Sequence, residues 1–210
     1  RALEDLCQTL RGVESDVVVF SDFRHGIFNR HTIPALTATI PARALRVADS
    51  QVASRWGNIL DFKGFDLITP NEREARFALG DQDLTIRPLA FELFTRAECR
   101  ALILKLGERG LLAYRRRPNI DDPRAFFVVD SFADRVVDAV GSGDALLAYA
   151  TLAVAATGNE VIAAVLGSIA AAVECEQDGN VPVTRDSVRR KLATLEQQAH
   201  YTVPAAAAAR

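Results

Sequence analysis

Asp138-Ala139-Val140-Gly141-Ser142-Gly143-Asp144 is the stretch that decides how this chain is understood. It follows a strand-like run, Phe126–Asp130, and leads into Ala145–Ala156, an apolar run that predicts a helix. Glycines let the backbone approach a ligand closely, and the free N–H groups at a helix start favour an anion. An aspartate there could accept a proton from a group that attacks a phosphate. A helix cap after a glycine turn is the simpler alternative.

The composition is that of an ordinary globular protein. The 210 residues predict one domain over residues 1–202 with a frayed tail over residues 203–210. The net charge of −2 gives no reason to expect nucleic acid or an anionic membrane as a partner. Three widely spaced cysteines and the lack of a signal peptide or membrane-spanning run predict a reducing compartment, which we take to be the cytoplasm.

The start of the sequence also carries information. The chain contains no methionine and opens inside a segment, Arg1–Leu10, that has a helical pattern. We therefore expect it to be a fragment of a longer protein.

Strands and helices alternate along most of the sequence. The predicted strands are Val17–Phe20, Arg46–Ala48, Phe65–Thr69, Leu102–Leu106, Leu111–Tyr114 and Phe126–Asp130. The predicted helices are Arg1–Leu10, a stretch within His31–Thr39, Val52–Leu60, Glu72–Leu79, Phe91–Arg100, Ala145–Ala156, Glu160–Cys175 and Arg185–Gln198, with a loop over Gly80–Pro88. This alternation predicts an α/β fold with a doubly wound, mainly parallel sheet.

Two further motifs could support chemistry. Asn71 and Glu74 follow a predicted strand, and an amide with a carboxylate can hold a hydrated Mg²⁺ there. A capping box at a helix start explains the same pair. Lys105-Leu-Gly-Glu-Arg-Gly110 closes a buried strand, and its glycines could admit a nucleotide, although a tight hairpin turn is simpler.

Other kinds of site find no support in the sequence. The histidines His25, His31 and His200 lack the spacing of zinc ligands. The motifs G-x-S-x-G, G-x-G-x-x-G and G-x-x-x-x-G-K-[ST] do not occur, which argues against a nucleophile elbow, a dinucleotide fold and a Walker loop.

Taken together, the motifs resemble those of the ribokinase, or PfkB, family of carbohydrate kinases. Residues 138–144 resemble the family signature D-T-x-G-A-G-D, and Asn71-x-x-Glu74 and Lys105–Gly110 precede it in the family's order. Gly179-Asn-Val-Pro182 resembles the family's late Gly-Ala-x-x-x-Pro turn. Four matches in order favour the functional interpretation of each motif. The resemblance implies a ribokinase-like fold whose N-terminal part and β lid are absent from this sequence.

The resemblance also implies roles for individual residues. Asp144 would be the catalytic base that deprotonates a sugar hydroxyl, and the anion hole would be the backbone of Gly141, Ser142 and Gly143. ATP, Mg²⁺ and a monovalent cation are the implied cofactors. Asn71 and Glu74 would contact Mg²⁺ through water, and Asp138 would be a cofactor contact that also lies at a metal. The other implied cofactor contacts are Lys105, Gly107, Gly110 and Ser168. The implied contacts to the substrate are Asp22 and Asp49.

Within the family, two stretches resemble the heptose 7-phosphate kinase branch. Ser21-Asp-Phe-Arg-His-Gly26 resembles its Ser-Asp-Tyr-x-Lys-Gly segment, and Asp61–Asn71 resembles its approach to Asn-x-x-Glu. The resemblance implies ATP-dependent phosphorylation of a sugar or sugar phosphate, with a heptose 7-phosphate as one candidate, a homodimer, and fusion to a nucleotidyltransferase. The alternatives are a nucleoside or pyridoxal-like kinase of this family and a non-catalytic nucleotide-binding module of a larger fusion protein.

Overall fold

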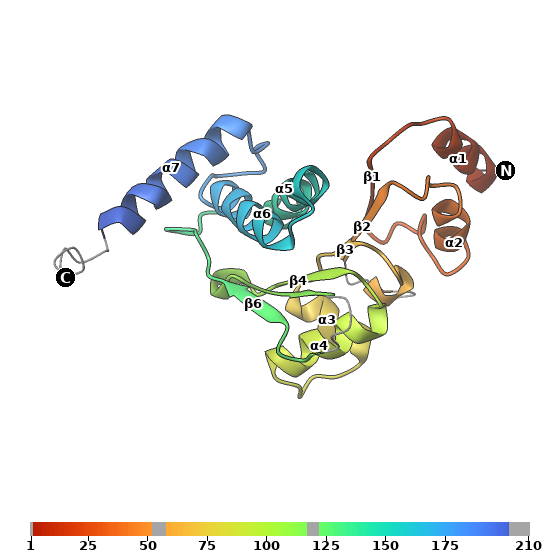
Figure 1. The fold of residues 1–210 in the computed structure, drawn as a ribbon, viewed down its shortest axis with the longest axis horizontal. Coiled ribbons are helices and arrows are strands. Elements are labelled where there is room, and N and C mark those ends of the chain that lie inside the picture. The colour runs from red at the N-terminus through yellow and green to blue at the C-terminus, as the bar shows by residue number, and fades with distance from the viewer. Residues whose placement is uncertain (1, 52–57, 117–121, 202–210) are drawn as a thin grey trace.

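The computed structural model describes residues 2–51, 58–116 and 122–201 (Figure 1). In these residues six strands form one sheet in the order of the sequence. β1 to β4 run parallel, and β5 and β6 are antiparallel to their neighbours. The strands are β1 (Val17–Asp22), β2 (Leu45–Ser50), β3 (Leu67–Ile68), β4 (Ala101–Lys105), β5 (Leu111–Arg115) and β6 (Phe126–Val129).

Helices cover both faces of this sheet. Figure 1 shows α3 and α4 on one side of β4 and α5 and α6 on the other. The α-helices are α1 (Ala2–Arg11), α2 (Thr32–Thr37), α3 (Glu72–Leu79), α4 (Ile86–Ala97), α5 (Ser142–Thr157), α6 (Glu160–Cys175) and α7 (Arg185–Tyr201). The predicted α/β fold with a mainly parallel sheet is therefore confirmed. No helix in the described ranges has the length and apolar character that a membrane span requires.

The alternation of side chains along the strands produces two apolar cores. On β4, Leu102 and Leu104 belong to one core, while Ala101 and Ile103 belong to the other. The first core includes residues of α1 to α4, and the second includes residues of α5 and α6. A strand that is buried on both faces has a continuous apolar sequence, which explains why β4 was predictable.

Small residues bring α5 and α6 close together. Gly167 is buried on α6, and a Cβ built on it would lie 3.0 Å from the Leu146 carbonyl oxygen and 3.2 Å from the Cβ of Ala150. Ala150 and Ala164 are both fully buried in the core below these helices. The close approach fixes where the start of α5 lies relative to α6.

The segment before β4 differs from the prediction. Gly80–Pro88 was expected to be a loop, but α4 already begins at Ile86 and includes Pro88. The first turn of a helix tolerates proline because its N–H groups have no intrahelical partner. α4 also ends before the predicted Arg100, since Glu98 adopts a left-handed φ of 51°.

Two other predictions fall partly or wholly on residues that the structure does not describe. Of the predicted helix Val52–Leu60, residues 52–57 lie outside the described ranges. At its other end, Ile59 and Leu60 belong to the 3₁₀ helix η1 (Ile59–Asp61), which Asn58 caps. The tail over residues 203–210 also lies outside the described ranges.

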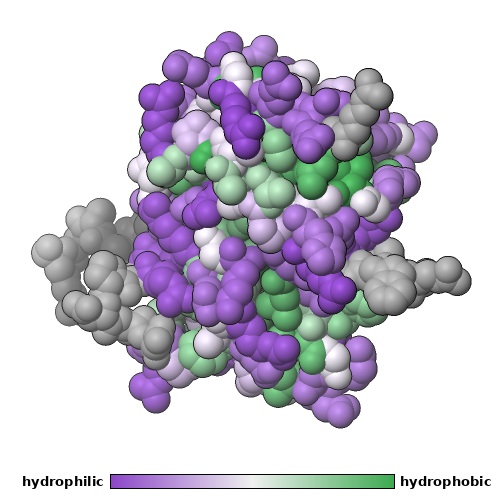
Figure 2. Space-filling model, turned by 90° about the vertical axis from the view of Figure 1, so that its right-hand side faces the viewer, coloured by the Kyte–Doolittle hydropathy of each residue, from purple (hydrophilic) through white to green (hydrophobic). Residues whose placement is uncertain are grey.

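β1 is the first strand in the order of the sheet. Figure 2 shows the side of the molecule that carries α1, α2 and β1, where hydrophilic residues surround smaller hydrophobic areas. Val19 on β1 and the following Phe23 and Ile27 are among the exposed large hydrophobic side chains. The strand nevertheless keeps Phe20 buried, which holds it against the first core.

The close packing of α5 on α6 generates a stability prediction. Gly167→Val should lower the free energy of unfolding by about 1–3 kcal/mol, because the added methyl groups must displace backbone and core atoms of α5. Urea unfolding followed by circular dichroism measures this loss. Ala155→Val on the exposed face of α5 is the control and should cost less than about 0.7 kcal/mol. Equal losses in the two variants would contradict the proposed packing.

Candidate active site

The parallel strands deliver polar side chains to one edge of the sheet. β1 ends at Asp22, β2 ends at Asp49 and Ser50, and β4 ends at Lys105. Thr69 follows β3 and donates a hydrogen bond from Oγ1 to Asp49 Oδ1 over 3.1 Å. Because the carboxyl ends of parallel strands share an edge, side chains that are far apart in the sequence meet there.

Lys105 links this edge to the start of α5. Its Nζ donates to both carboxylate oxygens of Asp49, over 3.1 and 3.2 Å. A Cβ built on Gly143 would lie 3.3 Å from the same Nζ, so the ammonium group lies beside the first turn of α5. The side chains of Lys105 and Asp49 are only 15% and 12% exposed, which reduces screening of the pair by water.

The turn before α5 has the conformation that the glycine signature predicts. Asp138 Oδ1 accepts a hydrogen bond from the Val140 N–H over 2.9 Å. Gly141 occupies the N-cap position with a left-handed φ of 86°. The N–H groups of Val137 and Asp138 donate to the carbonyl oxygen of Cys175, which anchors the turn to the end of α6.

Asp144 lies in the first turn of α5 and is exposed. Loss of hydration is the largest cause that raises its pKa, the nearby Asp49 carboxylate raises the pKa further, and the Lys105 ammonium opposes both. Within the described residues, the N–H groups of Gly143 and Asp144 have no hydrogen-bond partner. The helix start therefore presents free donors and its positive dipole end next to a carboxylate that can take up a proton.

Asn71 and Glu74 form the capping box at the start of α3. Asn71 donates from its backbone N–H and its side chain to the two Glu74 oxygens, over 2.7 and 2.8 Å, and its own Oδ1 accepts from the Glu74 N–H. Burial raises the pKa of Glu74, and the Lys105 ammonium is the largest opposing influence. Asn71 also forms a bridge with Lys105 at the end of β4. The pair thus lies at the same edge as Lys105.

This pair suits a metal that is bound through water. Carboxylate and amide oxygens are the ligands that Mg²⁺ prefers, and each Glu74 oxygen retains a lone pair beyond its capping bond. No group of three or more histidine, cysteine, aspartate or glutamate side chains that could hold a metal exists among the residues that the structure covers. A metal at this position would depend on water and on phosphate oxygens.

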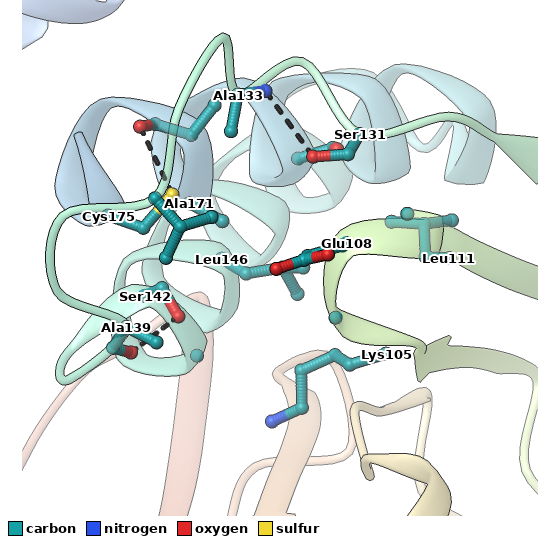
Figure 3. A pocket seen from close by; sticks show the side chains of 16 residues that line it. Lys105, Glu108, Leu111, Ser131, Ala133, Ala139, Ser142, Leu146, Ala171 and Cys175 are labelled. Carbon is teal, nitrogen blue, oxygen red and sulfur yellow. Dashed lines mark hydrogen bonds between the residues drawn. The ribbon is translucent and has the colours of Figure 1, made fainter.

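A cavity of about 220 Å³ lies between α5, α6 and the end of β4. Of the predicted site residues, it is lined by Lys105, Gly107, Gly110, Ser142, Gly143 and Ser168. Figure 3 shows Lys105 extending from β4 toward the turn that carries Ala139 and Ser142. At the other end, small and apolar side chains of α6 and the loop before the turn form the wall. One end of the cavity suits an anion and the other suits a flat apolar group.

Much of the apolar wall was not predicted from the sequence. Residues that were missed include Leu111, Val136, Leu146, Ala171, Ala172 and Cys175. Ala171, Ala172 and Cys175 follow Ser168 at helical spacing, so the face of α6 could have been inferred once Ser168 was assigned. Val136 offered no comparable signal, because it lies in a loop outside the sheet.

The glycine turn Gly107–Gly110 forms the floor of the cavity. Gly107 starts the 3₁₀ helix η2 (Gly107–Arg109), and Gly110 has a φ of 78°. A Cβ on Gly110 would lie 2.1 Å from the Val129 carbonyl oxygen, so only glycine fits against β6. Arg109 of this turn forms an ion pair with Glu72 of α3, which ties the turn to the Asn71–Glu74 corner.

Asp22 belongs to the same edge but is occupied by internal hydrogen bonds. It is 3% exposed and accepts bonds from the backbone N–H and Nη1 of Arg24, over 2.8 and 2.7 Å. Ser50 Oγ donates to it as well, over 3.2 Å. The residues that line the cavity do not include Asp22. Its predicted contact with a substrate therefore stays a prediction.

A second buried carboxylate lies behind the turn. Glu174 of α6 is 2% exposed, and neither of its oxygens has a hydrogen-bond partner in the described part of the chain. A Cβ on Gly141 would lie 2.7 Å from Glu174 Oε1 and 2.7 Å from Asn180 Oδ1. A buried carboxylate needs a proton or a cation to neutralise it. The oxygens of Asp138, Glu174 and Asn180 around this turn therefore suit a cation, and no sequence signal indicated Glu174.

Comparison with known proteins assigns the chain to a family. The model of the family described as pfkB family carbohydrate kinase matches residues 35–185. The bifunctional protein HldE of Bradyrhizobium sp. (strain ORS 278) is 28% identical over 182 residues, which cover 85% of this chain and 35% of that protein. The chain thus spans little more than a third of the length of this curated relative.

Two solved structures have the same fold. Phosphofructokinase-2 from Escherichia coli in complex with potassium superposes with a TM-score of 0.74 and 18% identity, over 92% of this chain and 62% of that one. Ribokinase from Thermotoga maritima superposes with a TM-score of 0.69 and 22% identity, over 89% of this chain and 59% of that one. At these identities the two structures establish the ribokinase-like fold and nothing finer.

The crowding around Gly141 generates a second prediction. Gly141→Ala should lower the free energy of unfolding by more than Gly158→Ala, which caps the other end of α5. Both glycines have a left-handed φ, which costs alanine about 1–2 kcal/mol. Only Gly141 would also clash with two oxygens, since no atom lies within 4 Å of a Cβ on Gly158. Urea unfolding compares the variants, and an equal loss would rule out the close contact with Glu174 and Asn180.

Proposed function

We propose that this chain, which belongs to the pfkB family of carbohydrate kinases, transfers the terminal phosphoryl group of ATP to a hydroxyl of a sugar or sugar phosphate. The observation that carries the proposal is the start of α5. There Asp144, with a raised pKa, stands next to free N–H groups and beside the cavity that Lys105 lines.

In this mechanism Asp144 accepts the proton of the attacking hydroxyl. Its raised pKa makes it a stronger base than an ordinary aspartate. The N–H groups of Gly141, Ser142 and Gly143 form the proposed anion hole and stabilise the charge that develops on the transferring phosphoryl group. In the structure the Ser142 N–H donates to the Ala139 carbonyl oxygen over 3.3 Å, so it must leave that bond to join the hole. The turn itself is held in place by its bonds to α6.

The cavity holds the nucleotide in this proposal. Its apolar end beside Ser168 suits the base, and the glycines at 107 and 110 let the backbone approach the ribose and phosphates. Asn71 and Glu74 would hold Mg²⁺ through water. When bound, Mg²⁺ neutralises phosphate charge, and the metal site near Asp138 would take a monovalent cation that neutralises Glu174.

For the acceptor we propose a class of compounds and not a single compound. Similarity to HldE and the segment Ser21–Gly26 favour a sugar phosphate such as a heptose 7-phosphate, with Asp22 as its proposed contact. HldE is named as bifunctional, which supports the proposal that this kinase unit is fused to a nucleotidyltransferase. Release of ADP with a panel of sugars, sugar phosphates, nucleosides and pyridoxal separates the acceptor classes.

The base assignment has a direct test in the full-length protein. Asp144→Asn should lower kcat by about 100- to 10,000-fold, because the amide cannot accept the hydroxyl proton. The affinity for ATP should change little, since binding does not need the base. Coupled measurement of ADP release gives kcat, with the exposed Asp83→Asn as the control. Near-normal turnover of the Asp144 variant would sink the proposal.

The raised pKa of Asp144 predicts how activity depends on pH. Protonated Asp144 cannot act as a base, so kcat/KM should fall as the pH drops through an apparent pKa above the ordinary value of about 3.9. Asp49→Asn removes a charge that raises this pKa, so the acidic limb should move to lower pH. A pH–rate profile of both proteins measures the shift, and movement to higher pH would contradict the electrostatic assignment.

A further inference from the structure

The basic side chain of Lys105 lies beside the place where the phosphates of the proposed nucleotide would bind. Among the 25 basic residues of the chain only Lys63, Lys105 and Lys191 are lysines, and Lys105 is the one at the edge of the sheet beside α5. An ammonium is a compact point charge with three donors, whereas a guanidinium is a broad planar fork. The space beside Gly143, where a Cβ would come within 3.3 Å of Nζ, suits the smaller group.

The hydrogen bonds of Lys105 leave it one donor for a ligand. Two of its three N–H groups reach the two Asp49 oxygens. Within the described residues no other hydrogen bond of this ammonium is found, and the side chain lines the cavity. Asp49 itself is held by Thr69 Oγ1, so it is a fixed support for the lysine.

The charges around Lys105 favour an anionic ligand that brings its own cation. The ammonium lowers the pKa of both Glu74 and Asp144, so it lies within electrostatic reach of the metal-organising corner and of the base. Gly143, whose N–H group is one of the free donors at the start of α5, lies beside this ammonium. A group that contacts this ammonium and these amides at once must be small and anionic, as a terminal phosphoryl group is.

We propose that the Lys105 ammonium binds the transferring phosphoryl group and that Asp49 is a positioning residue that holds the ammonium in place, instead of a contact to the sugar. This inference rests on the proposed kinase function. The acceptor oxygen forms a bond to the terminal phosphorus while the bond from that phosphorus to the bridging oxygen of ADP breaks. The hydroxyl proton passes to Asp144, and Lys105 remains protonated throughout.

The first experiment compares two nucleotides in the full-length protein. Lys105→Gln should weaken binding of the non-hydrolysable triphosphate AMP-PNP by about 10- to 100-fold, the loss expected for a charge-assisted hydrogen bond. Binding of ADP, which lacks the terminal group, should stay close to that of the unsubstituted protein. Isothermal titration calorimetry with Mg²⁺ measures both affinities. Lys63→Gln is the control, since Lys63 is 57% exposed and pairs with Glu98.

The outcomes separate this inference from the kinase proposal. An equal loss for AMP-PNP and ADP, or no loss for either, would overturn the contact of Lys105 with the terminal phosphoryl group while leaving the kinase proposal intact. An unsubstituted protein that binds neither nucleotide would overturn both. The acidic limb of the pH–rate profile should also move to higher pH in Lys105→Gln, because the lysine lowers the pKa of Asp144.

A second experiment leaves Lys105 unsubstituted, so its result does not depend on whether a Lys105 variant folds. Acetic anhydride should label Lys105 less in the presence of AMP-PNP than of ADP, while Lys63 reacts equally in both, as read by peptide mass spectrometry. Asp49→Asn should weaken AMP-PNP binding and increase the labelling of Lys105. If this variant instead raises only the KM for the acceptor, Asp49 contacts the sugar and the positioning role is wrong.

Discussion

Parallel pairing of β1 to β4 is the constraint on which the site depends. Each strand must return to the same end of the sheet, so the residues that follow the strands meet at one edge whatever their separation in the sequence. Asp49 and Lys105 are 56 positions apart and still form a two-bond ion pair there. The alternation along the strands builds a core on each face, so helices hold the edge rigidly from both sides.

The close packing of α5 on α6 completes the arrangement from the other direction. Gly167 allows the two helices to approach, and the end of α6 binds the turn before α5 through the Cys175 carbonyl oxygen. The start of α5 is thereby held next to Lys105. Preorganisation of this kind lets the free N–H groups act on a ligand without first rearranging.

The sequence predicted the fold and the position of the glycine turn, because both depend on local patterns. Continuous apolar strands and a glycine signature before a helix are properties of short segments. The end of α4 was missed because a left-handed Glu98, not a glycine, terminates it. The Lys105–Asp49 pair and the buried Glu174 could not be predicted, since each depends on where distant elements pack. The site roles inherited from the family resemblance remain predictions.

At Asn71 and Glu74 the local explanation does not exclude the proposed functional one. Asn71 and Glu74 do form a capping box, yet the cap itself fixes both side chains at the edge where Lys105 ends β4. Asp144 does not cap α5, because Gly141 occupies the N-cap position and no side chain in the described ranges caps this helix. The capping alternative was therefore wrong for Asp144, whose carboxylate stays exposed. The carboxylates of Asp49, Glu74 and Asp144 lie around a single ammonium, that of Lys105. Negative groups therefore outnumber the ammonium at this edge before any ligand binds. These charges are a reason to expect that, in the proposed function, a polyphosphate binds together with a cation.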